Sequence, residues 1–284
     1  MRKKASVSWY IAAVVLVLIF LLPFFVMIIK SFMSEEEVFD FTKLWPSSIV
    51  IANYYNKAIM PYILTWFMNT MIVAGLSIVG TLLSAFLCAY GFSKVHFKFK
   101  TIIFAATMAS TMLPSITMRI PLYMIYADWG WLNGTLKPLF VPAFLGGGAM
   151  NILLIMQFIK GIPNSVLESA RIDGANELRC LFRIVLPNCL PIALLVCVNT
   201  FLGVWNDYSS ALTFLRNSGE EKWTLALGLF ELSRGRYDDE QTQTFFRENQ
   251  QMAIGVLMCI PSMLIFGIFQ KSLIEGVAIS GVKA

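Results

Sequence analysis

Long apolar stretches alternate with short polar segments along the whole chain. Six of these stretches are long enough, at about 1.5 Å of rise per residue, to cross the roughly 30 Å apolar layer of a bilayer as helices. The pattern therefore predicts an all-α membrane protein with one transmembrane domain, residues 1–284, and spans at about residues 9–29, 63–92, 101–127, 138–159, 188–215 and 252–269.

Two of the predicted spans are interrupted. The third contains Pro114, Pro121 and Arg119, so we expect it to be kinked and to face protein rather than lipid. The fourth contains Gly146–Gly148, which allows either close helix contact or a break that lines a cavity. Close packing is the favoured interpretation.

The positive charges predict which segments lie in the cytosol. Residues 1–8, 93–100, 160–187 and 270–284 hold 12 Lys and Arg against 4 Asp and Glu, whereas the rest of the chain holds 10 against 13. Because cytosolic loops of membrane proteins are enriched in Lys and Arg, we expect these segments, and both termini, to be cytosolic. The first apolar stretch is followed by Lys30 rather than by a small-residue cleavage site, so a retained helix is expected instead of a signal peptide.

Composition supports the membrane class and argues against catalysis. The 284 residues are 57% hydrophobic and 14% charged, with a mean hydropathy of +0.70. The five cysteines show no paired spacing and the only histidine is His96, so we expect neither a metal site nor a catalytic residue. The chain also lacks a P-loop pattern, so any ATP and Mg²⁺ would be bound by a separate subunit.

The segment at 161–187 is the longest predicted cytosolic loop. Ser165 followed by Glu168 is typical of a capping box at a helix start, in which Glu168 would take the third helical position, and Gly174 can end that short helix. In a second helix, four apolar side chains with the spacing i, i+3, i+4 and i+7 predict one apolar face, and two prolines would close the helix: Leu178, Leu181, Phe182 and Val185, then Pro187 and Pro191.

The same loop carries a family resemblance. Glu168-Ser169-Ala170, Asp173-Gly174 and, after nine intervening residues, Ile184-Val185-Leu186-Pro187 resemble the EAA loop of bacterial ABC importer permeases, with Ser169 as the departure from alanine. The resemblance implies a coupling helix that docks into a cleft of a cytosolic ATPase subunit. The implied coupling residues are Glu168, Ala170, Asp173, Gly174, Leu178, Leu181, Phe182, Ile184, Leu186 and Pro187. A helix that only lies on the membrane is the alternative.

Further stretches resemble the smaller permease of maltose-type carbohydrate importers. They are Trp205-Asn206-Asp207-Tyr208 near the end of the fifth span, Thr224 to Leu229 in the predicted outer loop 216–250, and the closing segment up to Lys283. The resemblance implies that the outer loop probes an extracytoplasmic binding protein. A solvated loop with both charge signs is the alternative.

A sugar pathway through the membrane needs aromatic rings and amide or carboxyl groups. The candidate pathway residues are Tyr123, Asn151, Asn199, Trp205, Asn206 and Asp207. Trp and Tyr near a span end also form interfacial belts, and Asn within a helix also bonds neighbouring helices, so each candidate has a structural alternative. Asp207 could instead pair with Arg216 or Arg119.

Together these features predict a permease subunit of an ATP-driven sugar importer in the bacterial inner membrane. The resemblance implies four kinds of partner: a second related permease, two cytosolic ATPase subunits, an extracytoplasmic sugar-binding protein and membrane lipid, with no nucleic acid. An importer of another solute, such as a sugar phosphate, is one alternative, although the spans offer only Arg119 as a cation. A membrane scaffold or sensor without a transport path is another.

Overall fold

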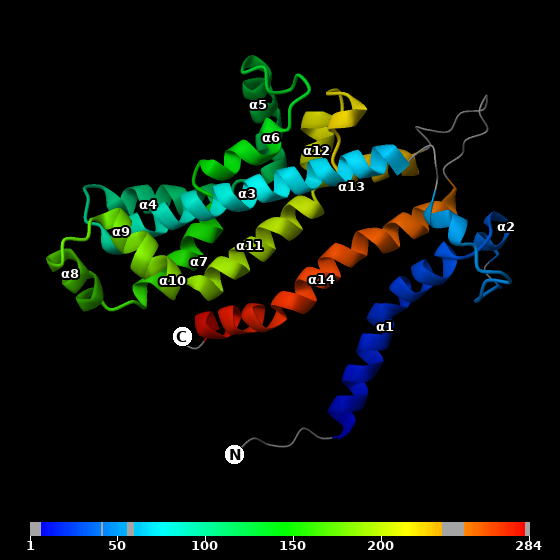
Figure 1. Ribbon diagram of the computed structural model, residues 1–284, viewed down its shortest axis with the longest axis horizontal. Helices are drawn as coiled ribbons and strands as arrows, with labels where there is room; N and C mark the ends of the chain where they lie inside the picture. The colour runs from blue at the N-terminus through cyan, green and yellow to red at the C-terminus, as the bar shows by residue number, and fades with distance from the viewer. Residues whose placement is uncertain (1–6, 41, 56–59, 235–246, 282–284) are drawn as a thin grey trace. The chain divides into compact units, whose positions relative to one another are not determined.

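The computed structural model describes residues 7–40, 42–55, 60–234 and 247–281, and within these residues it contains helices and turns but no strand (Figure 1). The all-helical fold class is confirmed. The chain divides into two compact units, one made of residues 1–61 and 229–263 and the other of residues 62–228 and 264–284. The helix α13 (Leu225–Ser233) and the long helix α14 (Glu248–Gly281) each contribute residues to both units.

The first unit contains α1 (Val7–Ser31), α2 (Glu35–Val38) and η1 (Ile51–Tyr54) besides its part of α14. Asn53 is buried and its amide donates to the carbonyls of Ser31 and Met33, at 2.9 and 2.8 Å. Asn249, at the start of α14, donates to the Asn53 side chain at 3.0 Å. These buried bonds tie the end of α1 to η1 and to the start of α14, because a buried amide without partners would be costly.

The second unit is built along α3 (Met60–Lys94), the cyan helix of Figure 1. Its other elements are α4 (Lys100–Ala109), η2 (Ser110–Met112), α5 (Ser115–Asp128), α6 (Lys137–Phe140), η3 (Val141–Phe144), α7 (Ala149–Lys160), α8 (Asn164–Ile172), α9 (Glu177–Cys180), η4 (Leu181–Val185), α10 (Leu186–Asn188), α11 (Leu190–Trp205), α12 (Tyr208–Leu215) and η5 (Glu220–Lys222). One hydrophobic core joins α3 to α7, α8, α9, η4 and α11.

Small residues let α3 approach its neighbours closely. A Cβ atom on Gly147 would lie 2.7 Å from the Thr81 carbonyl and 2.9 Å from the Ala85 Cβ. All three residues of Gly146–Gly148 have positive φ, between 67° and 111°, which glycine adopts without a steric penalty. The triple glycine therefore both breaks the fourth predicted span and packs closely against α3.

Among the described residues, four helical segments are long and apolar enough to cross a membrane, or up to six if each bent helix pair counts as one span. The four are α1 over Ser8–Ser31, α3, the segment Lys137–Lys160 and α14 over Glu248–Gln270. The orientation of the termini stays a prediction.

The two bent pairs show where proline changes the predicted spans. The third span is two helices, α4 with η2 and then α5, that meet at an angle of 103° around Pro114, whereas Pro121 lies inside α5 without ending it. The fifth differs from the predicted continuous helix 188–215. It bends by 83° just before Pro191, and α11 ends at Trp205 because Asp207 caps a new helix, α12.

The predicted outer loop 216–250 is partly helical. It contains η5, α13 and the first residues of α14, while residues 235–246, which hold four of its twelve charged residues, lie outside the described residues. Residues 282–284 at the end of the predicted closing segment lie outside them as well.

Candidate functional site

The first helix of the predicted coupling loop is α8. It begins directly after Pro163, and no side chain caps its first turn, so the expected capping box of Ser165 and Glu168 is wrong. Glu168 is the fifth residue of the helix rather than the third and is exposed. The side chain of Asn164 is engaged elsewhere, since its carbonyl oxygen accepts a hydrogen bond from Lys94 Nζ of α3 at 2.8 Å.

The end of α8 explains the glycine of the motif. The Ala175 N–H donates to the Ala170 carbonyl at 2.9 Å, and the Gly174 N–H donates to the Arg171 carbonyl at 3.0 Å. This pair of bonds is a Schellman motif, in which Asp173 is the C-cap and the next residue is left-handed. Gly174 has φ of 84°, and a Cβ there would meet nothing within 4 Å, so conformation rather than space requires glycine.

The second helix of the loop is continuous from α9 through η4 to α10, but its middle is one turn of π-helix. The Leu186 N–H donates to the Leu181 carbonyl, five residues back. Pro187 lacks an N–H, and in an α-helix its ring would clash with the carbonyl of Arg183, so a wider turn before the proline removes the clash. Pro187 therefore reshapes the helix, which runs on to Asn188, instead of closing it as expected.

The predicted apolar face of this helix is rotated in the structure. Leu181 and Val185 are buried at 1% and 0% exposure, but Leu178 and Phe182 are 57% and 45% exposed, so the four do not form one buried face. The buried face instead includes Cys180. Ile184 and Leu186 are half-buried and pack against the same core.

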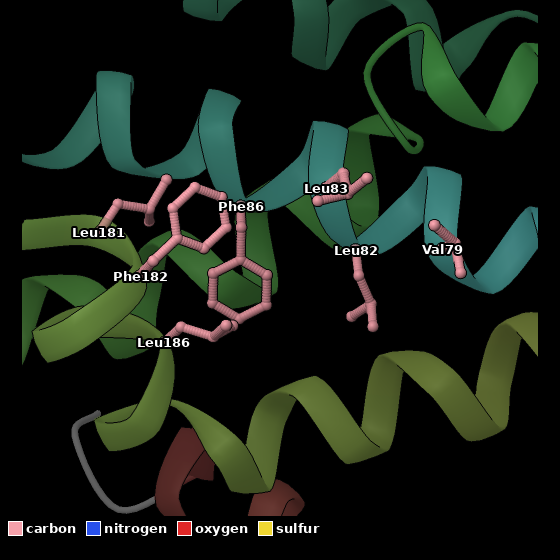
Figure 2. Close-up of a pocket in the computed structure, with 7 residues that line it drawn as sticks. All are labelled: Val79, Leu82, Leu83, Phe86, Leu181, Phe182 and Leu186. Atoms are coloured by element: carbon pink, nitrogen blue, oxygen red, sulfur yellow. The ribbon is translucent and has the colours of Figure 1, made fainter. Parts of the chain in front are cut away.

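The exposed side of this helix borders an apolar groove (Figure 2). The groove has a volume of about 220 Å³ and is lined by side chains of α3 and of the loop helix: Val79, Leu82, Leu83, Phe86, Leu181, Phe182 and Leu186. Every lining residue is hydrophobic. The groove therefore lacks the polar groups that a sugar site requires.

Polar side chains hold the loop against the end of α3. The Tyr90 hydroxyl donates to Glu177 Oε2 at 2.5 Å, and Arg171 donates to both carboxylate oxygens of Glu177, at 2.9 and 3.2 Å. Lys94 Nζ also donates to the Ile162 carbonyl at 2.7 Å. The hydrogen bond from Arg171 to the Glu177 carboxylate raises the pKa of the guanidinium, which therefore stays charged.

The hydrogen bond between Tyr90 and Glu177 explains why the apolar face of the loop helix is rotated. Tyr90 draws Glu177 toward α3, and the residues one helical turn further on, Cys180 and Leu181, are then the ones that enter the core. Glu177 lies 87 positions from Tyr90 in the chain, so the spacing of apolar residues within the loop could not show it.

Several side chains of α8 stay exposed. Leu167 alone on α8 is buried, at 1%, and Ala170 packs half-buried against the same core. Two exposed apolar residues that the sequence reasoning missed lie on this helix, Val166 at 45% and Ile172 at 86% exposure. The signal that could have found them is their position on the side of α8 that Leu167 does not occupy.

The candidate pathway residues lie on several elements and the described contacts do not join them into one site. Tyr123 is on α5 and 39% exposed, and Asn151 on α7 donates to the Gly147 carbonyl of its own turn at 2.8 Å. Trp205 is buried at 1% and stacks on Phe201, with ring centroids 5.6 Å apart, so it belongs to the core. Asp207 accepts the Ser210 N–H at 2.9 Å as the N-cap of α12, a role that the sequence reasoning did not foresee.

One face of α11 nevertheless stays polar and open. Asn199, Gly203 and Asn206 follow one another at helical spacing and are all exposed, on a helix that otherwise consists almost entirely of apolar residues. Polar groups in a membrane helix normally face protein or a water-filled cavity rather than lipid. This face is the part of the predicted pathway that the structure leaves accessible.

The described residues include no group of three or more His, Cys, Asp or Glu side chains that could hold a metal ion.

Comparisons with known proteins agree with these features. Residues 81–278 match the family model of the binding-protein-dependent transport system inner membrane component. The chain is 27% identical to the melibiose/raffinose/stachyose import permease protein MelC of Bacillus subtilis, over 99% of this chain and 98% of that one. It is 31% identical to the galactooligosaccharides transport system permease protein GanQ of the same organism, over 81% and 77% of the two chains.

A solved structure shares the fold. A chain from the crystal structure of a bacterial ABC transporter involved in the import of the acidic polysaccharide alginate superposes with a TM-score of 0.76, covering 95% of this chain and 99% of that one at 24% identity. With the family model matching well over half of the residues, the chain belongs to the inner membrane components of binding-protein-dependent transport systems.

Proposed function

We propose that this chain is one of two permease subunits in an ATP-driven importer of a sugar or oligosaccharide. A second, related permease supplies the other half of the path. Two cytosolic ATPase subunits bind ATP and Mg²⁺, and an extracytoplasmic binding protein delivers the sugar. The proposed location is the bacterial inner membrane.

The geometry of α8 is the observation that carries this proposal. The helix is seated in the core by Leu167, ended by Gly174 and leaves Val166, Glu168 and Ile172 exposed. An amphipathic helix of this kind fits into a hydrophobic groove of a partner. The exposed apolar residues, one turn and a half apart, are then the anchors, and Glu168 lies between them for a polar contact.

Support for a carbohydrate comes from the relatives and from α11. MelC and GanQ are named as permeases for oligosaccharides. The open face of Asn199, Gly203 and Asn206 offers amide groups to hydroxyls, and Gly203 leaves space for a solute to approach the helix, since a Cβ there would meet nothing within 4 Å. Of the candidate pathway residues, Asn199 and Asn206 are the two that we retain for direct sugar contact.

The test is ATPase activity of the complex that co-purifies with the tagged chain, measured before and after adding the binding protein with candidate oligosaccharides. We expect one loaded sugar to stimulate hydrolysis, and we expect Gly174→Val to abolish the stimulation, because a β-branched residue is strained at positive φ. Gly130→Val is the matched control, since Gly130 also has positive φ, 67°, and no neighbour closer than 4.0 Å, but lies outside the loop. Equal losses from both variants, or no co-purifying ATPase, would contradict the proposal.

A further inference from the structure

The helix α3 is held by hydrogen bonds at both ends, and each end holds a different functional loop. At one end lie Tyr90 and Lys94, which bind the coupling loop. At the other end lie Trp66, Asn69 and Thr70, which bind the segment from Glu220 to Leu225 in the predicted outer loop. We name these two sets of contacts the inner latch and the outer latch.

The outer latch consists of neutral, buried groups. Trp66 Nε1 donates to the Glu220 carbonyl at 2.8 Å, and Asn69 Nδ2 donates to the carbonyls of Glu221 and Trp223 at 2.8 and 2.9 Å. The Thr70 hydroxyl accepts the Leu225 N–H at 2.9 Å. Four bonds thus fix six consecutive residues of the outer loop to one turn of α3.

Packing reinforces these bonds. Trp66, Thr70 and Trp223 are all fully buried, and the rings of the two tryptophans lie 5.9 Å apart. Gly228 fits directly against the Trp66 ring, because a Cβ there would lie 2.1 Å from a ring carbon. The loop cannot move away from α3 without exposing these side chains.

The two latches lie on opposite sides of the predicted bilayer. From Trp66 to Tyr90 the helix rises about 36 Å at 1.5 Å per residue, slightly more than the apolar thickness of a membrane. The α3 helix is continuous over Met60–Lys94 and contains no proline between Trp66 and Tyr90. A displacement of the outer loop along the helix axis is therefore carried to the coupling loop without a hinge between them.

We infer that α3 is a rigid link that transmits the docking of the loaded binding protein from the outer latch to the coupling loop, with Thr70, Asn69, Tyr90 and Glu177 as its positioning residues. This inference rests on the proposed function, since it takes the outer loop to face the binding protein and the coupling loop to face the ATPase.

The test compares the ratio of stimulated to unstimulated ATPase activity in the assembled complex. Tyr90→Phe removes the hydroxyl that donates to Glu177 in the inner latch. Thr70→Val removes the hydroxyl that accepts the Leu225 N–H in the outer latch. We expect each variant to lower the ratio by about fivefold, the lower end of typical coupling between distant sites. Glu177→Gln keeps an acceptor for Tyr90 but removes the charge that Arg171 binds, so we expect a smaller fall.

Each variant has a matched control. Tyr126 is buried to the same extent as Tyr90, 5% against 4%, but no described contact joins its hydroxyl to the coupling loop, so Tyr126→Phe should leave the ratio unchanged. The Thr107 hydroxyl donates to a carbonyl four residues back, as that of Thr70 does, but Thr107 is only half-buried and accepts no N–H of another element among the described bonds. Thr107→Val should therefore also leave it unchanged.

The double variant Thr70→Val with Tyr90→Phe separates transmission from local damage. Effects of distant, independent sites add, whereas two breaks in one rigid link do not. We expect the double variant to lose no more than the stronger single variant. Two outcomes would overturn the inference and leave the proposed function intact, provided that wild type is stimulated. One is additive losses in the double variant, and the other is a ratio equal to that of wild type in both single variants. A wild-type complex without stimulation would instead overturn the proposed function itself.

Discussion

The outer and inner latches hold the same helix by different chemistry. In the outer latch an indole, an amide and a hydroxyl bind main-chain groups, and Trp66 and Thr70 are fully buried. In the inner latch Tyr90 binds the Glu177 carboxylate, which also pairs with Arg171 of the same loop, and the side chains of this ion pair are 37% and 51% exposed for Arg171 and Glu177. Buried hydrogen-bonded groups are costly to separate, whereas an exposed ion pair contributes about 0–1 kcal/mol.

This difference indicates which end moves. A latch that costs little to open can break and re-form during a transport cycle. The outer latch behaves as part of the core. We therefore expect the outer loop and α3 to move together and the coupling loop to adjust against them.

The largest predicted effect is on the outer latch. Trp66→Ala removes a fully buried side chain that packs on Trp223 and Gly228, and should lower the free energy of unfolding by about 3–5 kcal/mol. Thermal unfolding in detergent measures this. Trp45→Ala, at a residue 73% exposed, is the control and should change the stability little. Similar losses of stability in the two variants would contradict the claim that the outer latch is the more costly of the two latches to separate.

The next effect is that of Asn69. Asn69→Ala leaves the carbonyl of Glu221 and the buried carbonyl of Trp223 without this donor, and we expect a loss of about 2 kcal/mol in the same unfolding measurement. Asn188→Ala is the matched control, because the amide of Asn188 is exposed and bonds only a carbonyl of its own helix among the described contacts. A loss for Asn188→Ala as large as for Asn69→Ala would show that the hydrogen bonds of the outer latch contribute no more to stability than an exposed bond within one helix.

Salt should distinguish the two latches by a smaller amount. Screening weakens exposed ion pairs far more than buried neutral bonds. Raising the ionic strength should therefore speed hydrogen exchange at the Ala175 amide of the coupling loop, by at most about fivefold, and leave the Leu225 amide of the outer latch unchanged. In Glu177→Gln the salt dependence at Ala175 should disappear. Salt effects of equal size at both amides would contradict the assignment.

The smallest predicted effect is a pH dependence of the stability of the segment 34–47. Glu37 accepts hydrogen bonds from the Ser34 and Ser47 N–H groups and from Lys43, and bonds from Ser47 and Lys43 lower its pKa from 4.5 to about 2. Because the folded pKa is below the unfolded one, the carboxylate stabilises this segment fully above about pH 4.5 and loses that contribution as the pH falls toward 2.

Hydrogen exchange at the Ser47 amide measures this loss. The amide should exchange faster as the pH falls through that window, after correction for the intrinsic pH dependence, and Glu37→Gln should show no such window. A pH dependence that persists in Glu37→Gln would assign the titration to another group.

Much of the fold followed from local signals. Apolar runs located the ends of the first four predicted spans within a few residues, Pro114 marked the bend between α4 and α5, and Gly174 marked the end of α8. Each of these features depends on residues within one or two turns, so the sequence displays it directly. For the triple glycine the alternatives were close helix contact and a break that lines a cavity. The structure shows a break in the helix together with close contact to α3.

Features that depend on distant residues did not follow. The rotation of the loop helix depends on Tyr90, the start of α8 on Lys94, and the burial of Trp205 on Phe67. The outer latch was missed for the same reason, since Asn69 and Trp223 are 154 positions apart. Residue type suggested a sugar contact for both Trp205 and Asp207. The residues around them show instead that Trp205 lies in the core and that Asp207 caps α12.

The central claim is that the exposed face of α8 docks on a cytosolic ATPase subunit. A photo-crosslinking amino acid at Ile172, which is 86% exposed, tests it directly in the intact complex. The control position is Leu44, which is 75% exposed and lies between the first two predicted spans, outside the predicted cytosolic segments. The account predicts that Ile172 forms a product with the ATPase subunit and that Leu44 does not. A product with the ATPase from Leu44, or only lipid adducts from Ile172, would contradict it.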